Sequence, residues 1–163
     1  MSEVDRGFTL TRLLGAPRER VFQAWTDPNE LGWFFSGLGD PREPIEVDLR
    51  VGGAWRQKMV VDQDTEYVTG GIYREIVPPE RLVFVWGATD GWPRIDPEHI
   101  DDGPIVTVTL NEAGDKTEMV FELRLPDHLP EDKVREWFAM GVRNGWSDTI
   151  DRMVDRFAGA VRS

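Results

Sequence analysis

A long amphipathic segment near the C-terminus, residues 130–158, constrains the fold more than any other feature of the chain. Its apolar residues recur every three or four positions, the spacing of one helical face. Glu131 and Asp132 fall in the first turn, where carboxylates complement the helix dipole. Because such a helix must bury its apolar side, we expect it to lie on the concave face of a sheet. The predicted inward side consists of Val134, Phe138, Gly141, Val142, Gly145, Thr149, Met153 and Phe157, flanked by Trp137, Trp146 and Ile150.

Seven strand-like stretches rich in β-forming residues predict that sheet. The alternation of apolar and polar residues is clearest in residues 117–125, where Met119, Phe121 and Leu123 share one face. In residues 54–61, Trp55 and Gln57 share the face expected to point inward. The predicted strands are residues 8–14, 45–49, 54–61, 67–77, 81–86, 105–110 and 117–125.

Two short helices are predicted between the first and second strands. Residues 18–25 carry apolar side chains at helical spacing, and Asp27 with Pro28 has the pattern of a second helix start. The element order is therefore β-α-α-β-β-β-β-β-β-α, an α+β fold with a curved antiparallel sheet wrapped around a long C-terminal helix. No repeat or long linker divides the chain, so we expect a single domain over residues 1–163.

Composition excludes several functions. The net charge is −11 and no stretch clusters lysine and arginine, which argues against nucleic acid as a partner. The chain has no cysteine, hence no disulfide, thiolate metal site or cysteine nucleophile. The longest apolar run, residues 82–88, is far shorter than the roughly 20 residues that cross a bilayer. We therefore expect a cytoplasmic protein with no membrane span.

Gly141 and Gly145 lie one turn apart on the predicted inward side of the helix. A glycine inside a helix costs about 1 kcal/mol relative to alanine, so a compensating role is expected. The missing side chains allow either a close approach of helix and sheet or a space for a guest molecule.

Tryptophan is abundant, with seven residues in the chain. Six of them fall near elements that border the predicted interior: Trp33, Trp55, Trp86, Trp92, Trp137 and Trp146. They can line a pocket for a flat or apolar ligand, or they can simply fill the core.

No motif for metal binding, nucleotide binding or nucleophilic catalysis is present, and we expect no metal, no cofactor and no catalytic residue. The histidines are His99, in the acidic loop 96–102, and His128. A hard cation could sit in that loop, but it lacks the spacing of a calcium loop, and a solvated loop is favoured.

Five polar residues are predicted near the interior: Arg12, Gln57, Tyr73, Glu75 and Asn144. A buried Glu75 could carry a proton, with Tyr73 as a second candidate. The alternative, which we favour, is that these groups satisfy one another or face solvent.

Several motifs resemble those of the SRPBCC superfamily, nearest to the heat shock protein 90 ATPase activator homologue family. They are GAPRERVFQAWTDP at 15–28 with Leu31 and Trp33-Phe34, VGGAW at 51–55, GIYREIVPPERLVFVW at 71–86, and Gly145-Trp146. The resemblance implies the START and birch-pollen-allergen helix-grip fold, with an internal cavity that related proteins use for lipids, polyketides and sterols. On that basis the pocket-lining residues are Trp33, Trp55, Met59, Tyr73, Trp86, Phe121, Phe138, Val142 and Trp146.

The resulting hypothesis is a protein, monomeric or homodimeric, that binds a small hydrophobic molecule between the sheet and the C-terminal helix. One alternative is a co-chaperone-type module with a chaperone partner and a role in the stress response. In the eukaryotic activators, however, a separate N-terminal domain dominates ATPase stimulation, and we expect no counterpart of it within these 163 residues. The other alternative is a cyclase- or hydrolase-like enzyme acting on a cavity-bound substrate.

Overall fold

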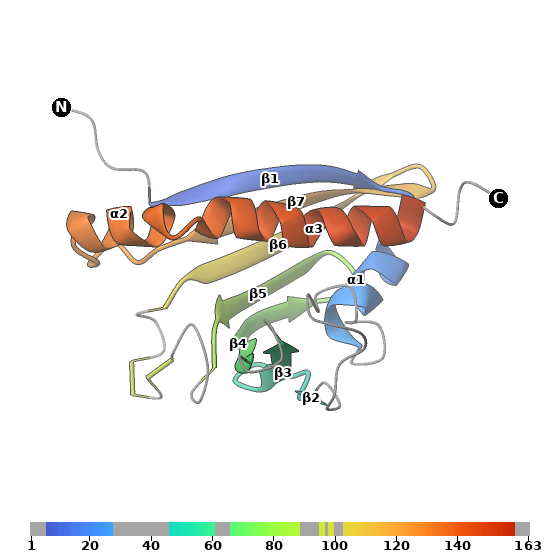
Figure 1. Cartoon of the computed structure of the whole chain (residues 1–163). Coiled ribbons are helices and arrows are strands. Elements are labelled where there is room, and N and C mark those ends of the chain that lie inside the picture. The colour runs from blue at the N-terminus through green and yellow to red at the C-terminus, as the bar shows by residue number, and fades with distance from the viewer. Residues whose placement is uncertain are drawn as a thin grey trace.

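The computed structural model describes residues 6–27, 46–60, 66–88, 95–96, 98–99 and 103–158. Over these residues, seven strands form one antiparallel sheet in the order β1-β7-β6-β5-β4-β3-β2. Figure 1 shows the curved sheet behind the long helix α3, with β1 above the helix and β5 to β2 below it. The strands are β1 (Gly7–Leu14), β2 (Glu46–Val47), β3 (Ala54–Val60), β4 (Glu66–Val77), β5 (Arg81–Trp86), β6 (Ile105–Ala113) and β7 (Lys116–Arg124).

The predicted antiparallel α+β architecture is confirmed, as is the predicted order of the first helix and the seven strands. Strands β2 to β7 are neighbours in chain order, and β1 joins the sheet beside β7. Strand β2 is shorter than the predicted 45–49, and the predicted helix that begins at Asp27 and Pro28 falls almost wholly in residues outside the described part.

Alternation along the strands builds the core on the concave face. In β7, Met119, Phe121 and Leu123 are buried while their neighbours face outward. Val108 of β6 lies opposite Phe121 in the register and is buried with it. Because side chains alternate across a strand, one face of each pair becomes apolar.

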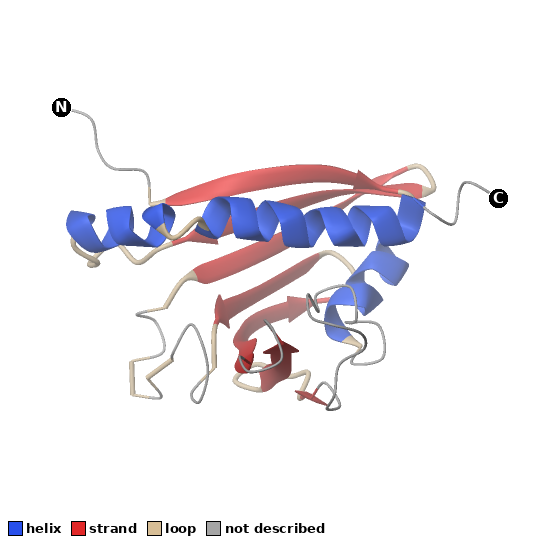
Figure 2. Ribbon diagram, in the orientation of Figure 1, coloured by secondary structure: helices blue, strands red, loops and turns tan. Residues whose placement is uncertain are grey.

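Three helices are described: α1 (Arg18–Thr26), α2 (Glu131–Ala139) and α3 (Val142–Ala158). Figure 2 shows α2 and α3 end to end across one face of the sheet, and α1 beneath the far end of α3. The side chains by which α3 enters the core are Val142, Trp146, Ile150 and Met153.

The C-terminal segment is two helices, which corrects the prediction of a single helix over residues 130–158. Gly141 adopts a φ of +84°, a left-handed conformation that ends α2, and its N–H donates to the carbonyl of Phe138 at 3.0 Å. The break changes which side of the helix faces the sheet. Trp146 and Ile150 are therefore buried and not flanking, and Gly145 is exposed and not inward. Neither explanation of an inward glycine pair applies to Gly145.

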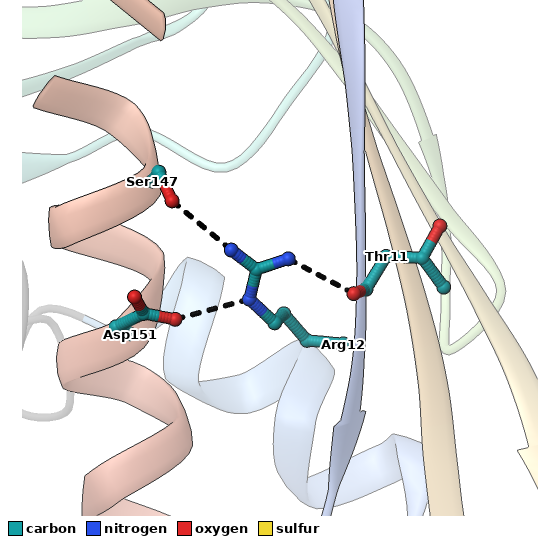
Figure 3. Close-up of polar contacts among 4 residues, drawn as sticks. All are labelled: Thr11, Arg12, Ser147 and Asp151. Atoms are coloured by element: carbon teal, nitrogen blue, oxygen red, sulfur yellow. Dashed lines mark hydrogen bonds and ion pairs between the residues drawn. The ribbon is translucent and has the colours of Figure 1, made fainter. Parts of the chain in front are cut away.

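Arg12 fastens α3 to the edge strand β1. Its side chain points from β1 toward the helix, where Nε donates to Asp151 Oδ1 and Nη2 donates to Ser147 Oγ, each at 3.0 Å (Figure 3). The remaining guanidinium nitrogen donates to the carbonyl of Thr11. The N-terminal strand and the C-terminal helix are thereby joined by charge-assisted hydrogen bonds at the partly exposed edge of the sheet.

The two glycines should respond oppositely to alanine. A Cβ at Gly145 would meet nothing within 4 Å, so Gly145→Ala should raise the free energy of unfolding by about 0.5 kcal/mol through helix propensity. Gly141→Ala should lower it by about 1–2 kcal/mol, because an L side chain is strained at this φ. Urea unfolding of both variants measures the difference. A destabilising Gly145→Ala would contradict the exposure of that position.

Candidate functional site

The side chains between the sheet and the helices include a continuous line of aromatic contacts. Trp86 of β5 lies 6.2 Å from Trp137 of α2 and 5.1 Å from Trp146 of α3, measured between ring centroids. Trp146 in turn lies 4.7 Å from Phe121 of β7. These contacts connect both C-terminal helices to the middle of the sheet.

The same line of aromatic contacts continues through α1 to β3, near the opposite edge of the sheet. Trp25 of α1 stacks on Phe121 at 6.3 Å and lies 6.2 Å from Phe84 of β5. Phe84 meets Trp55 of β3 edge-on at 5.7 Å. Such ring pairs contribute beyond the area that they bury, so the line is a stabilising element of the core as well as a candidate lining.

The predicted pocket-lining residues can now be placed. Trp55, Tyr73, Trp86, Phe121, Val142 and Trp146 are buried in the core, and Phe138 is half-buried against it. Trp33 lies outside the described residues, as does the side chain of Met59. The structure therefore brings most of the set together, and their role in ligand binding stays a prediction.

Polar groups lie beside this aromatic line on β3 and β4. The indole N–H of Trp86 donates to Thr69 Oγ1 at 3.1 Å, and that of Trp55 donates to Gln57 Oε1 at 3.3 Å. Thr69 was not among the predicted site residues. The alternation of Thr69, Gly71 and Tyr73 along β4 was the signal that could have identified it.

Two of these interior groups lack a protein partner. Gln57 Nε2 and Tyr73 Oη are buried and form no hydrogen bond to any residue that the structure describes. Both residues are 1% exposed. A buried polar group without a partner costs about 1–3 kcal/mol, so these atoms mark a place where a further group would be stabilising.

The strand register explains why Gln57 and Tyr73 share one face. Gln57 lies opposite Thr69, and the N–H of Tyr73 donates to the carbonyl of Gly53 at 2.9 Å. Gly71, between them on β4, leaves room for the ring of Phe84. A Cβ there would come within 2.6 Å of that ring.

The environment of Tyr73 keeps its hydroxyl protonated. Burial raises the pKa of the Tyr73 hydroxyl well above its ordinary value, and the negative charge of Asp48 raises it further. The hydroxyl therefore stays neutral near physiological pH and is available as a hydrogen-bond donor.

Three other polar residues predicted near the interior have different positions. The Glu75 carboxylate is 44% exposed and lies 3.6 Å from Arg81, so the interpretation of a buried proton carrier is wrong. Asn144 faces solvent, and Arg12 is used in the contact with α3. We favoured the interpretation that the five polar groups either bond to one another or face solvent. Glu75, Asn144 and Arg12 fit it, because each is paired or exposed, but Gln57 Nε2 and Tyr73 Oη do not.

The acidic loop brings three possible metal ligands together. Ligand atoms of Asp96, Glu98 and His99 lie within 4.8 Å of one another, and all three residues are exposed. Asp96 accepts the backbone N–H of Glu98 and faces Nδ1 of His99, both at 3.0 Å. These contacts within the turn account for the grouping.

A hollow of about 200 Å³ lies over the start of β1 and the end of β7. Its lining residues are Arg6, Gly7, Phe8, Thr9, Glu122, Leu123 and Arg124. Neither Gln57 nor Tyr73 borders it, so it is separate from the predicted pocket.

Across the described part of the chain, no helix is long and apolar enough to cross a membrane.

Comparison with known proteins gives a family and a fold. The family model described as "Activator of Hsp90 ATPase homolog 1-like protein" matches residues 15–158. None of the curated proteins matches the chain.

Among solved structures, a protein of Chromobacterium violaceum is 25% identical, covering 93% of this chain and 96% of its own, with a TM-score of 0.63. A protein of Rhizobium leguminosarum is 26% identical, with coverages of 92% and 94% and a TM-score of 0.62. A protein of Nitrosomonas europaea is 19% identical, with coverages of 99% and 100% and a TM-score of 0.72, and shows the shared fold.

Removing the unpartnered hydroxyl should not harm the ligand-free protein. Tyr73→Phe should raise the free energy of unfolding by about 1 kcal/mol, because it removes a buried polar atom without a partner. As a control, Thr117→Val should lower it by about 1–2 kcal/mol, because the Thr117 hydroxyl donates to the carbonyl of Ala16 at 2.8 Å. Urea titration of dialysed, refolded protein measures both. A Tyr73→Phe loss as large as that of Thr117→Val would show that the hydroxyl has a protein partner.

Tyr73 should also make stability depend on pH above about 10, the ordinary pKa of tyrosine. The folded state keeps the proton because the pKa of the buried hydroxyl is raised, whereas the unfolded state releases it. Rising pH therefore favours unfolding. Relative to Tyr73→Phe, the wild type should lose about 1.4 kcal/mol of unfolding free energy per pH unit from about pH 10 upward. Parallel pH profiles would contradict the burial of the hydroxyl.

Proposed function

This chain belongs to the Activator of Hsp90 ATPase homolog 1-like family, and we propose that it binds a small, largely apolar molecule between the concave face of the sheet and α3. The observation that carries the proposal is the pair of unpartnered buried groups, Gln57 Nε2 and Tyr73 Oη. They lie in an interior otherwise lined by aromatic rings.

The energetics support a guest molecule at this place. Each unpartnered group costs the ligand-free protein stability, and a bound acceptor would recover that cost. The rings of Trp55, Trp86 and Trp146 supply the apolar surface that dominates most small-molecule sites. A few polar groups in an apolar interior are the usual means by which such sites orient a ligand.

An enzymatic role receives less support from the same residues. The Glu75 side chain is 44% exposed and paired with Arg81. The raised pKa of Tyr73 lies far from neutral, whereas a proton carrier works best with a pKa near the working pH. Neither candidate proton carrier is therefore suited to that role.

A second candidate function is a co-chaperone-type interaction with a chaperone, and it rests on the description of the matched family. Two exposed apolar side chains, Leu49 at 43% and Val51 at 64%, lie in the turn before β3 and offer a contact surface. Chaperone ATPase rates with and without saturating protein test this candidate, and unchanged rates would remove it. The cytoplasmic location and the monomeric or homodimeric state stay predictions.

Native mass spectrometry of freshly purified protein tests the ligand-binding proposal. We expect an apolar adduct that is released on activation. Val142→Phe, which adds bulk on the buried face of α3, should reduce the retained fraction about ten-fold, the effect of roughly 1.4 kcal/mol of overpacking.

Gly145→Phe is the matched control, because it places the same phenylalanine side chain on the exposed face of α3, where a Cβ would meet nothing within 4 Å. It should retain the adduct. Thermal melting of both variants establishes that they are folded. An adduct that survives unchanged in folded Val142→Phe, or a wild type that carries none and binds no added aromatic compound, would count against the proposal.

A further inference from the structure

We infer that the guest is an uncharged, elongated molecule with a hydrogen-bond acceptor, such as a carbonyl oxygen, near each end, one bonded by Gln57 and the other by Tyr73. This inference rests on the proposed function and specifies the chemistry of its ligand. It follows from what the two groups donate, how far apart they lie, and which charges surround them.

Gln57 presents donors to the guest. Its Oε1 already accepts the indole N–H of Trp55 at 3.3 Å, which fixes the orientation of the amide. Nε2 carries two N–H donors and finds no acceptor in the described part of the chain. The complementary ligand group is therefore an acceptor.

Tyr73 presents a donor as well. Its hydroxyl has no partner among the residues that the structure describes, and burial together with Asp48 keeps it protonated by raising its pKa. A protonated phenol buried in an apolar interior donates readily to a carbonyl or ether oxygen. Both Gln57 and Tyr73 would therefore bind a hydrogen-bond acceptor of the ligand.

The strand register sets the distance between the two donors. Tyr73 lies opposite Gly53, and Gln57 is four residues further along β3. At about 3.3 Å per residue, the two side chains start roughly 13 Å apart. Trp55 lies between them on the same face of β3, so the middle of the guest would meet an aromatic ring. A molecule that contacts both donors spans on the order of 10 Å.

The charges around the site disfavour an ionised guest. Among the described residues, no lysine or arginine side chain is fully buried, so a carboxylate or phosphate would have no buried counter-charge. The negative charge of Asp48 acts on the Tyr73 end. An ammonium group would instead face the N–H donors of Gln57. A neutral molecule avoids both penalties.

Equilibrium dialysis with four probes of one shape tests the inference. They are biphenyl, para-acetylbiphenyl, its para,para′-diacetyl counterpart, and biphenyl-para-carboxylate. We expect the diacetyl compound to bind the wild type about ten-fold more tightly than biphenyl, the effect of satisfying two buried donors. The monoacetyl compound should lie between them, and the carboxylate should bind more weakly than the monoacetyl compound.

Two variants and a control assign the preference to the two donors. Tyr73→Phe and Gln57→Leu should each reduce the preference for the diacetyl compound to that of a single carbonyl, about three-fold over biphenyl. Thr117→Val removes a buried hydroxyl outside the site and should keep the full preference.

Equal binding of biphenyl and the diacetyl compound would overturn the inference while leaving the proposed function standing. So would a preference that survives in both Tyr73→Phe and Gln57→Leu, or tightest binding of the carboxylate. Failure of all four probes to bind the folded wild type would overturn the proposed function itself, and this inference with it.

Discussion

Trp146 packs against Phe121 at 4.7 Å and edge-on against Trp86 at 5.1 Å, and the rest of the arrangement depends on this contact. It anchors α3 on the middle of the sheet, and Arg12 fixes the same helix to the edge strand β1. With α3 held at these points, the curved sheet has a defined interior. A line of large rings in contact with one another runs through that interior from α2 across to β3.

The buried tryptophans of this core need hydrogen-bond acceptors, and β3 and β4 supply some of them. Trp55 and Trp86 have their indole N–H groups satisfied by Gln57 and Thr69. The donors left over, Gln57 Nε2 and Tyr73 Oη, are a cost that packing alone does not explain. A bound molecule with matching acceptors explains it, since the guest turns two unfavourable groups into binding contacts.

Alternation along the strands was enough to predict the sheet and the inward direction of Trp55, Gln57 and Phe121, because a strand has only two faces. The break at Gly141 was not predicted, because glycine can adopt either the helical or the left-handed conformation and the sequence does not show which one it takes. That break misplaced Gly145. The prediction that Glu75 lies near the interior was wrong because the register of β4 against β5 shifts between Tyr73 and Glu75, which interrupts the alternation of the strand. Which inward polar atoms lack partners depends on side-chain geometry, which no pattern encodes.

A crystal structure of the protein as freshly purified tests the central claim most directly, by showing what lies next to Gln57 Nε2 and Tyr73 Oη. The account predicts a non-protein acceptor at about 3 Å from at least one of the two atoms, belonging to an apolar molecule between the sheet and α3. Protein groups or ordered water bonded to both atoms, with no guest, would contradict it.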